Sequence, residues 1–483
     1  MSGSLKSTTV RNVGYNSVAK IIQMAVMASA TVILSRTLAP TDYGIVGFAG
    51  IFIAFMSQFS DLGINSAVIR KKELEQRELF TAFTIKFFIG LVIFILAYIS
   101  APLAVRFFDN PAIIWVIRLM AFNFVLSTIG FVPQILLIRK LDFKKIAMAN
   151  LLPAILNSVV AVTLALLGFK YWSLVIALLV MTLCTGILLN IFQPVRHRFA
   201  CDANVATYLM NFGGNVFLSG FITFLIFNAD NFLIGSVNGA TNLGYYSLAF
   251  NWGSMACTMI GGIVMSVLLP TFSRMQGDRE RLKSSYLKVL QVISFGGVLI
   301  NMTLFVVSRD FLTQVLGHNS DKWLPALTTL RILCFYGILR LLLEPVGQVV
   351  MALARTDVLR RATLLVAAIE LIGLYPALHF LGIEGVALLV TVAYVSQYVL
   401  YYRLIRLELR ISFRELYSSV GPALWGALFI GPVFLVGESG GSNSVSVLLL
   451  EIAGCVVIYL VSYGMMTKWF LYKNIISITR TFR

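Results

Sequence analysis

Long apolar segments alternate with short polar gaps along the whole chain. About fourteen of these segments reach the roughly 20 mostly apolar residues that a helix needs to cross the hydrocarbon core of a bilayer. The pattern predicts transmembrane helices at residues 13–35, 43–69, 80–101, 112–133, 146–168, 171–193, 205–235, 243–270, 289–308, 323–351, 362–380, 384–402, 417–437 and 445–466. Because hydrocarbon offers no water to pair exposed backbone groups, each span is expected to be helical. The predicted fold class is therefore an all-α polytopic membrane protein.

The composition supports a membrane protein. Of the 483 residues, 59% are hydrophobic and 12% are charged, whereas soluble domains carry about 25% charged residues. The net charge of +17 does not indicate a nucleic-acid partner, because the basic residues lie between apolar segments rather than on a polar surface. The 5 cysteines and 3 histidines show no spacing typical of a metal or redox site. We therefore expect no nucleic acid, no metal and no resident cofactor.

The basic residues fix a predicted orientation, since lysine and arginine concentrate in cytoplasmic loops. Of the 38 in the chain, five lie in the alternate gaps of one side (Arg36, Arg106, Lys170, Arg309 and Lys322) and five lie inside the apolar segments (Lys20, Lys86, Arg118, Arg331 and Arg340), which leaves 28 for the other side. The basic side includes both termini. Both ends of the chain are therefore predicted to be cytoplasmic, and every loop is too short to hold a separate domain.

The chain repeats itself at an offset of 200 residues. Residues 34–49 match residues 234–249 at Thr41/Thr241, Gly44/Gly244 and Ala49/Ala249, and Gly14/Gly214 extends the register. Both stretches fall at the outer hairpin that opens a six-helix set, so the two halves have the same topology and an axis along the membrane normal. We predict two lobes, at 1–200 and 201–410, and an appended helix pair at 411–483. The alternative is chance recurrence of Gly and Thr in short hairpins.

Two helices in equivalent positions carry polar stripes at helical spacing. The stripes comprise Asn12, Asn16, Lys20 and Gln23 on the first helix and Asn211, Asn215, Ser219 and Thr223 on the seventh. An ionisable group in hydrocarbon costs about 2.5–3.5 kcal/mol, so it normally faces a partner or a water-filled cavity. We expect a polar seam in which Lys20 acts as a point charge for a phosphate. In the structural alternative, Lys20 snorkels to the headgroups.

The tenth helix is a second polar region. It carries Arg331, Arg340 and Glu344, followed by Pro345 as an expected kink point. Arg340 and Glu344 are four residues apart and can pair along the helix, whereas Arg331 is expected to meet Glu370 on the eleventh helix. The functional interpretation is a cationic surface for an anionic substrate beside a protonatable carboxylate. The structural interpretation is a set of buried pairs that fixes helix packing.

Four more charged residues complete the candidates. Lys86 and Arg118 are candidates to line the cavity, or they snorkel from positions near helix ends. Asp61 and Asp230 join Glu344 and Glu370 as candidates for coupling to an ion gradient, or they serve local structure.

Motifs of common enzymes are absent from the sequence. There is no GxxxxGK[ST] loop for ATP, no GxSxG elbow and no HExxH zinc helix. A membrane-embedded glycosyltransferase or polymerase would need acidic catalytic residues in a sizeable outer loop, and the outer acidic residues here are scattered in short turns. That enzyme class stays the less favoured alternative.

Three segments resemble the polysaccharide transporter family of the multidrug/oligosaccharidyl-lipid/polysaccharide exporter superfamily, in particular its Wzx-type flippases of the colanic-acid and teichuronic-acid exporter kind. They are ILSRTLAPTDYGIVGFAGIFIAFMSQFSDLGINSAVIRKKEL at 33–74, IRKLDFKKIAMANL at 138–151 and NADNFLIGSVNGATNLGYYSLAF at 228–250. The first resembles the family's N-terminal hallmark, the second its inner loop after helix four, and the third its helix 7–8 signature.

The resemblance implies two six-helix lobes, two further helices and a cationic central cavity in the bacterial cytoplasmic membrane. It implies that undecaprenyl-pyrophosphate-linked oligosaccharide repeat units move to the outer leaflet by alternating access, with the prenyl tail in lipid beside helices one and eight. H⁺ or Na⁺ is the expected coupling ion. Expected partners are the lipid-linked substrate, membrane lipids, and a polymerase or glycosyltransferases of the same pathway.

Two other transporter classes stay open. A lipid II flippase shares the fourteen helices and the basic cavity. A multidrug or cation antiporter would usually have twelve helices and an acidic pocket, so the extra pair and the basic bias argue against it.

Overall fold

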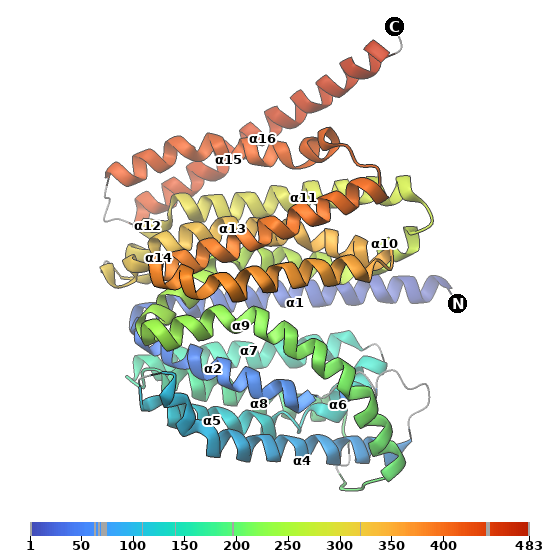
Figure 1. Cartoon of the computed structure of the whole chain (residues 1–483), viewed down its shortest axis with the longest axis vertical. Coiled ribbons are helices and arrows are strands. Elements are labelled where there is room, and N and C mark those ends of the chain that lie inside the picture. The colour runs from blue at the N-terminus through green and yellow to red at the C-terminus, as the bar shows by residue number, and fades with distance from the viewer. Residues whose placement is uncertain are drawn as a thin grey trace. The chain divides into compact units, whose positions relative to one another are not determined.

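The computed structural model describes most of the chain. Its backbone description omits residues 1, 62–63, 66–67, 69–74, 109, 141, 196–197, 319, 441–444 and 482–483, and its side-chain description also omits 2–18, 61, 208–223, 226, 263, 265–267, 270, 356, 433–440, 445 and 469–481. Within the described residues every regular element is a helix (Figure 1). Contacts divide the chain into two compact units, Met1–Ser247 and Leu248–Arg483. The lobe boundaries predicted at 200 and 410 stay predictions.

The first unit is built from helices, most of which match the expected spans. Its elements are α1 (Ser2–Thr37), α2 (Pro40–Asp61), α4 (Gln76–Ser100), the 3₁₀ turn Ala101–Arg106, α5 (Ala112–Leu126), α6 (Phe131–Arg139), α7 (Phe143–Leu166), α8 (Trp172–Phe192) and most of α9 (Ala203–Gly253). Helix α7 packs against α1 and α8, and α5 packs against α2, α4 and α8. Small groups of buried apolar side chains lie at these contacts, one of them around Ile64, Phe83 and Phe131.

The second unit has a larger apolar core. Its further elements are the π-helical turn Cys257–Gly261, α10 (Gly262–Met275), α11 (Arg279–Val306), α12 (Ser308–Asp310), the π turn Phe311–Leu316, the 3₁₀ turn Asp321–Ala326, α13 (Leu327–Ala352), α14 (Thr356–Glu408), α15 (Phe413–Gly440) and α16 (Val445–Thr481). The core joins α10, α11, α13, α14, α15 and α16. The expected extra helix pair is α15 and α16, which pack on each other and on α11.

The all-α polytopic fold is confirmed. Among the described residues, nine helices are long and apolar enough to span a membrane, or ten when α5 and α6 are joined as one span. Two further pairs of expected helices run together in α9 and α14 across single glycines. Gly239 has a φ of 79° and Gly382 a φ of 64°, a left-handed conformation that glycine adopts at low cost. These two glycines are the turns between the seventh and eighth and between the eleventh and twelfth expected helices.

The fourth expected span, 112–133, is wrong in its form and its end. The helix breaks between Leu126 and Phe131, bends by 48° and continues as α6 to Arg139. The break is stable because Asn190 of α8 donates to the Ile129 carbonyl over 2.7 Å. Gly130 also lies so close to α8 that a Cβ there would be 2.9 Å from Leu189 Cδ1. Contacts with a neighbouring helix, rather than local propensity, therefore decide this element.

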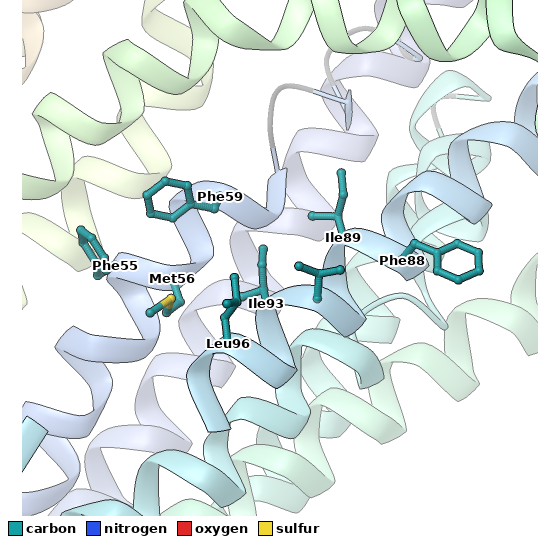
Figure 2. Close-up of a pocket in the computed structure, with 8 residues that line it drawn as sticks. Phe55, Met56, Phe59, Phe88, Ile89, Ile93 and Leu96 are labelled. Atoms are coloured by element: carbon teal, nitrogen blue, oxygen red, sulfur yellow. The ribbon is translucent and has the colours of Figure 1, made fainter. Parts of the chain in front are cut away.

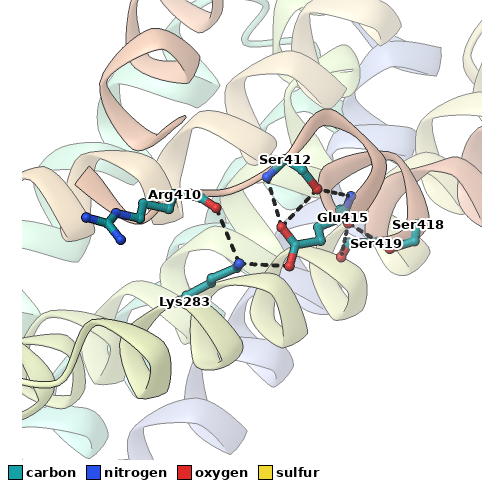
Figure 3. A network of polar contacts seen from close by, with 6 residues as sticks. All are labelled: Lys283, Arg410, Ser412, Glu415, Ser418 and Ser419. Atoms are coloured by element: carbon teal, nitrogen blue, oxygen red, sulfur yellow. Dashed lines mark hydrogen bonds and ion pairs between the residues drawn. The ribbon is translucent and has the colours of Figure 1, made fainter. Parts of the chain in front are cut away.

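Ion pairs tie the predicted cytoplasmic ends of the second unit together. Lys283 of α11 pairs with Glu415 of α15 at 2.8 Å and donates to the Arg410 carbonyl over 3.3 Å, while Ser412 caps the helix through the same carboxylate (Figure 3). Arg355 contacts both Asp357 and Glu408. Partial burial opposes ionisation of Glu415, but the hydrogen bonds from Lys283 and Ser412 outweigh it and hold the pKa of this carboxyl below its ordinary value.

Candidate functional site

The two hairpins of the predicted repeat pack against each other within the first unit. A Cβ on Gly44 would overlap the Ala240 carbonyl and lie 2.9 Å from its Cα, and a Cβ on Gly244 would overlap the Pro40 carbonyl and lie 3.2 Å from its Cα. Pro40 and Ala240 are themselves 200 residues apart. A Cβ on Gly47 would lie 3.6 Å from Oγ of Ser247. Ser247 is the residue that corresponds to Gly47 in the second copy of the repeat. A local two-fold axis therefore relates the two hairpins at this contact.

The polar stripe of the first helix is described only in part. Lys20 and Gln23 are half-buried on α1, and the Gln23 amide lies 4.0 Å from Met27 Sδ. Asn16, Asn215 and Asp61 are candidates whose side chains lie outside the described residues. The predicted seam between the two stripes stays a prediction.

Lys86 is held inside the first unit. Its side chain is 8% exposed, and its Nζ donates to the Ser60 carbonyl over 2.8 Å and lies 3.3 Å from Ser60 Oγ. The ammonium also lies 5.8 Å from the centre of the Phe131 ring. A cation buried between α2, α4 and α6 does not snorkel to the headgroups, so the snorkelling alternative is wrong for Lys86.

Arg118 has a different environment, at the surface of α5. Its guanidinium lies over the rings of Tyr98 and Trp115, 4.5 and 5.0 Å from their centres, and Nε lies 3.4 Å from the Tyr98 carbonyl. Trp115 is 59% exposed. An arginine held by exposed aromatic rings is typical of a side chain at the membrane interface.

Arg331 of α13 contacts one residue of α11 and one of α12. Its Nε donates to Ser308 Oγ over 2.9 Å, and its guanidinium lies 5.8 Å from the centre of the Phe305 ring. The sequence did not point to Ser308, and the expected pairing of Arg331 with Glu370 stays a prediction. These contacts hold the Arg331 side chain of α13 against α11 and α12.

Arg340 lies in an aromatic environment of the second unit. Its Nη1 donates to Tyr336 Oη over 3.2 Å, one turn earlier on α13. The Tyr336 ring is buried and contacts Phe250 of α9 and Tyr394 of α14, with ring centres 5.3 and 4.8 Å apart. Tyrosines therefore position the guanidinium.

Glu344 lies beside the π-helical turn. A Cβ on Gly261 would lie 3.9 Å from Glu344 Cγ and 3.7 Å from both Cys257 Sγ and Leu341 Cδ1. Helix α13 continues through Pro345 to Ala352. Single π turns within helices are often found at functional sites, and this one brings a carboxyl and a guanidinium of α13 next to a glycine-rich part of the eighth expected helix.

The remaining two carboxyls are buried. Glu370 on α14 is 5% exposed and Asp230 on α9 is 6% exposed. Asp230 accepts hydrogen bonds from Tyr246 Oη at 2.7 Å and from the backbone and side chain of Asn231 at 2.7 and 2.9 Å. Tyr246 comes from the other side of the Gly239 turn, so Asp230 joins the two arms of the second hairpin.

Comparison with known families gives a match over residues 33–328, to a family described as polysaccharide biosynthesis protein. The match covers more than half of the chain. The chain belongs to this family.

Two relatives of this chain are also named for the biosynthesis of surface polysaccharides. This chain is 26% identical over 362 residues to the lipopolysaccharide biosynthesis protein WzxC of Escherichia coli K12, across 74% of this chain and 72% of that one. It is also 26% identical over 299 residues to the teichuronic acid biosynthesis protein TuaB of Bacillus subtilis 168, across 62% of this chain and 61% of that one.

A solved structure supports the fold. The lipid II flippase MurJ, in an inward closed conformation, superposes with a TM-score of 0.73 at 14% sequence identity, over 95% of this chain and 99% of that chain. At this identity the likeness concerns the fold alone. It agrees with the polytopic helical architecture of this member of the polysaccharide biosynthesis family.

Sequence reasoning missed the partners of several charges. Tyr336 could have been found from its spacing of four residues before Arg340. Ser60 and Ser308 could not, because each contact joins two separate helical elements, whose packing the local pattern does not give, and serine carries no distinctive signal.

Proposed function

We propose that this protein is a flippase that moves undecaprenyl-pyrophosphate-linked oligosaccharide repeat units from the cytoplasmic to the outer leaflet for assembly of a surface polysaccharide. The observation that carries the proposal is the family match over residues 33–328, together with relatives named for lipopolysaccharide and teichuronic acid biosynthesis. The bacterial cytoplasmic membrane, with both termini cytoplasmic, is part of the same proposal.

Fixed cations within the helices suit this task. The main cost of flipping is to bring a charged, hydrated headgroup through hydrocarbon. Lys20, Arg331 and Arg340 offer positive charge at positions inside expected spans, and Tyr336 holds the Arg340 guanidinium in place before a substrate arrives. A guanidinium binds phosphate oxygens in pairs, whereas the Lys20 ammonium acts as a point charge.

Alternating access needs an energy source, and we propose an ion gradient, carried by H⁺ or Na⁺. Glu344 is the first carboxyl to test because it lies beside the π-helical turn and on the same helix as Arg340. Glu370 and Asp230 follow as buried carboxyls. Substitution of Glu344 or Glu370 by glutamine, or of Asp230 by asparagine, removes the charge and keeps the shape.

The test is genetic and chemical. A deletion strain should lose the surface polymer and accumulate lipid-linked repeat units that are accessible only from the cytoplasmic face of membrane vesicles. The intact gene should restore both. A deletion strain with normal polymer and no accumulated intermediate contradicts the proposal.

A lipid II flippase is the second candidate, because such a flippase shares the fourteen helices and the basic cavity that the sequence predicts. The same strains distinguish the two. Rescue of cell-wall synthesis after MurJ depletion favours lipid II, whereas a polymer defect with unchanged cell-wall synthesis favours the oligosaccharide substrate.

A further inference from the structure

An apolar groove lies between α2 and α4 in the first unit. Its cavity volume is about 510 Å³, and its lining is made of apolar side chains: Phe55, Met56, Phe59, Phe88, Ile89, Val92, Ile93 and Leu96. In Figure 2 Met56 of α2 lies near Ile93 and Leu96 of α4, while the ring of Phe88 points away from α2. The volume falls within the range of about 300–1,000 Å³ that is common for small-molecule sites.

The chemistry of the lining selects hydrocarbon. No lining side chain can hydrogen-bond a sugar or a phosphate, and a polar group placed there without a partner would be destabilised. Phe88, Val92 and Leu96 are each 53% exposed, so the groove is open along α4. It can take a chain from the side without opening of the helix bundle.

Positive charge lies at one end of the groove. Ser60, which accepts from Lys86 Nζ over 2.8 Å, directly follows the lining residue Phe59, and Lys86 precedes the lining residue Ile89 by one helical turn. Lys86 is nearer than the groove to the predicted cytoplasmic end of α4. A ligand with a long apolar tail and an anionic end at the cytoplasmic face matches this arrangement in both polarity and direction.

The other side of the groove adjoins α9. The ring of Phe55 contacts the ring of Phe224, with centres 5.8 Å apart. The groove therefore follows the side of α2 where it meets α9. The opening beside helices one and eight, which the family resemblance implies, stays a prediction.

We propose that this groove holds the polyprenyl tail of the lipid-linked substrate, with the anionic end of the lipid toward Lys86. The inference rests on the proposed function for the identity of the lipid. Among the residues that the structure describes, a single groove with Lys86 near its end fits a single-chain anionic lipid better than a two-chain phospholipid, whose second chain would have no counterpart in the lining.

The test measures binding and not transport. The full-length protein is reconstituted in vesicles of phosphatidylethanolamine and phosphatidylglycerol with a diazirine-bearing polyprenyl phosphate, and labelled peptides are identified by mass spectrometry. A parallel sample contains a diazirine-bearing phosphatidylglycerol. The polyprenyl probe should label α2 and α4, and unlabelled undecaprenyl phosphate should compete while added phospholipid should not.

A matched pair of variants locates the label. Val92→Trp fills the groove, whereas Ile95→Trp adds the same side chain on α4 at a position that is 44% exposed and outside the lining. Groove labelling should fall about tenfold in Val92→Trp, the change expected for roughly 1.4 kcal/mol of lost binding, and stay unchanged in Ile95→Trp. Leu96→Trp provides a second filling variant if Val92→Trp does not reach the membrane.

Three results would overturn the groove proposal: label outside α2 and α4, equal labelling of the filled and control variants, or equal labelling and competition by the phospholipid. The last outcome would make the groove a site for bulk lipid. If the deletion strain exports polymer normally while groove labelling persists, the proposed substrate fails and the polyprenyl-binding groove stands.

Discussion

Gly44 and Gly244 are 200 residues apart in the chain. Each of them packs against the backbone at the start of the helical segment that contains the other. Gly44 meets Ala240 and Gly244 meets Pro40, with no room for a Cβ at either position. A repeat that the sequence shows as a few identities is thus a physical contact, in which equivalent residues take equivalent parts. Close approach of two helix backbones through glycine is a common way to join helices within a membrane.

The first prediction follows from this contact. Gly44→Ala should force the two hairpins apart, at a cost of about 1–3 kcal/mol for overpacking, and should lower polymer export because the closed hairpin contact is lost. Gly50→Ala is the matched control on the same helix, since nothing lies within 4 Å of a Cβ there. Disulfide cross-linking between cysteines introduced at the two hairpin tips would measure the separation. Equal cross-linking in both variants would contradict the prediction.

The second prediction concerns the cations within the membrane. Lys20→Ala and Arg331→Ala, at normal membrane abundance, should abolish polymer export and leave lipid-linked repeat units on the cytoplasmic leaflet. Arg360→Ala, an exposed position in a predicted cytoplasmic loop, should export normally. Vesicle sidedness assays and surface polymer measurements check this result. Unimpaired export from both test variants would remove the proposal that these cations handle the substrate.

A third prediction compares the two contacts of the Lys86 ammonium, with the carbonyl and with the hydroxyl of Ser60. Lys86→Met removes the hydrogen bond to the Ser60 carbonyl and should lower the free energy of unfolding by about 1.5–3 kcal/mol, the usual range for a charged donor. Ser60→Ala keeps that carbonyl and loses only the 3.3 Å hydroxyl contact, so its effect should be smaller. Thermal unfolding of the purified variants in detergent gives both values, and the reverse order would show that the hydroxyl is the main partner.

The spans were predictable from the sequence because each depends on one property, a long apolar run, that is local in the chain. The turn at Gly239 and the place of α15 and α16 as an added pair followed from the same pattern and from the repeat. The break between α5 and α6 was not predictable, because it depends on contacts with Asn190 and Gly186 of α8, more than fifty residues away.

The candidate site shows the same division between local and distant information. A charge inside an apolar run marked Lys86 and Arg331 as unusual, whereas their partners Ser60 and Ser308 depend on how helices pack. The groove between α2 and α4 is invisible in the sequence for a further reason: its residues are ordinary apolar side chains, and only the gap between two helices distinguishes them from those that face lipid.

The last prediction concerns pH and the ion pairs at the predicted cytoplasmic ends of the second unit. The hydrogen bonds from Lys283 and Ser412 hold the pKa of Glu415 below its ordinary value of 4.5 against the opposing effect of partial burial. A carboxyl whose pKa is lowered by folding stabilises the folded state above its unfolded pKa, and this contribution is lost as the pH falls through the folded pKa. The melting temperature of the wild type should therefore decrease from about pH 5 toward pH 3, by more than that of Glu415→Gln.

At pH 7 the Glu415→Gln variant should melt below the wild type, and the two should converge in acid. Glu280→Gln, an exposed carboxyl on α11, should follow the wild type throughout. High salt should narrow the difference at pH 7, because the Glu415 side chain is 40% exposed and its pair with Lys283 is open to screening. A constant difference between wild type and Glu415→Gln at all pH values would show that the stabilisation comes from packing and not from the ionised carboxylate.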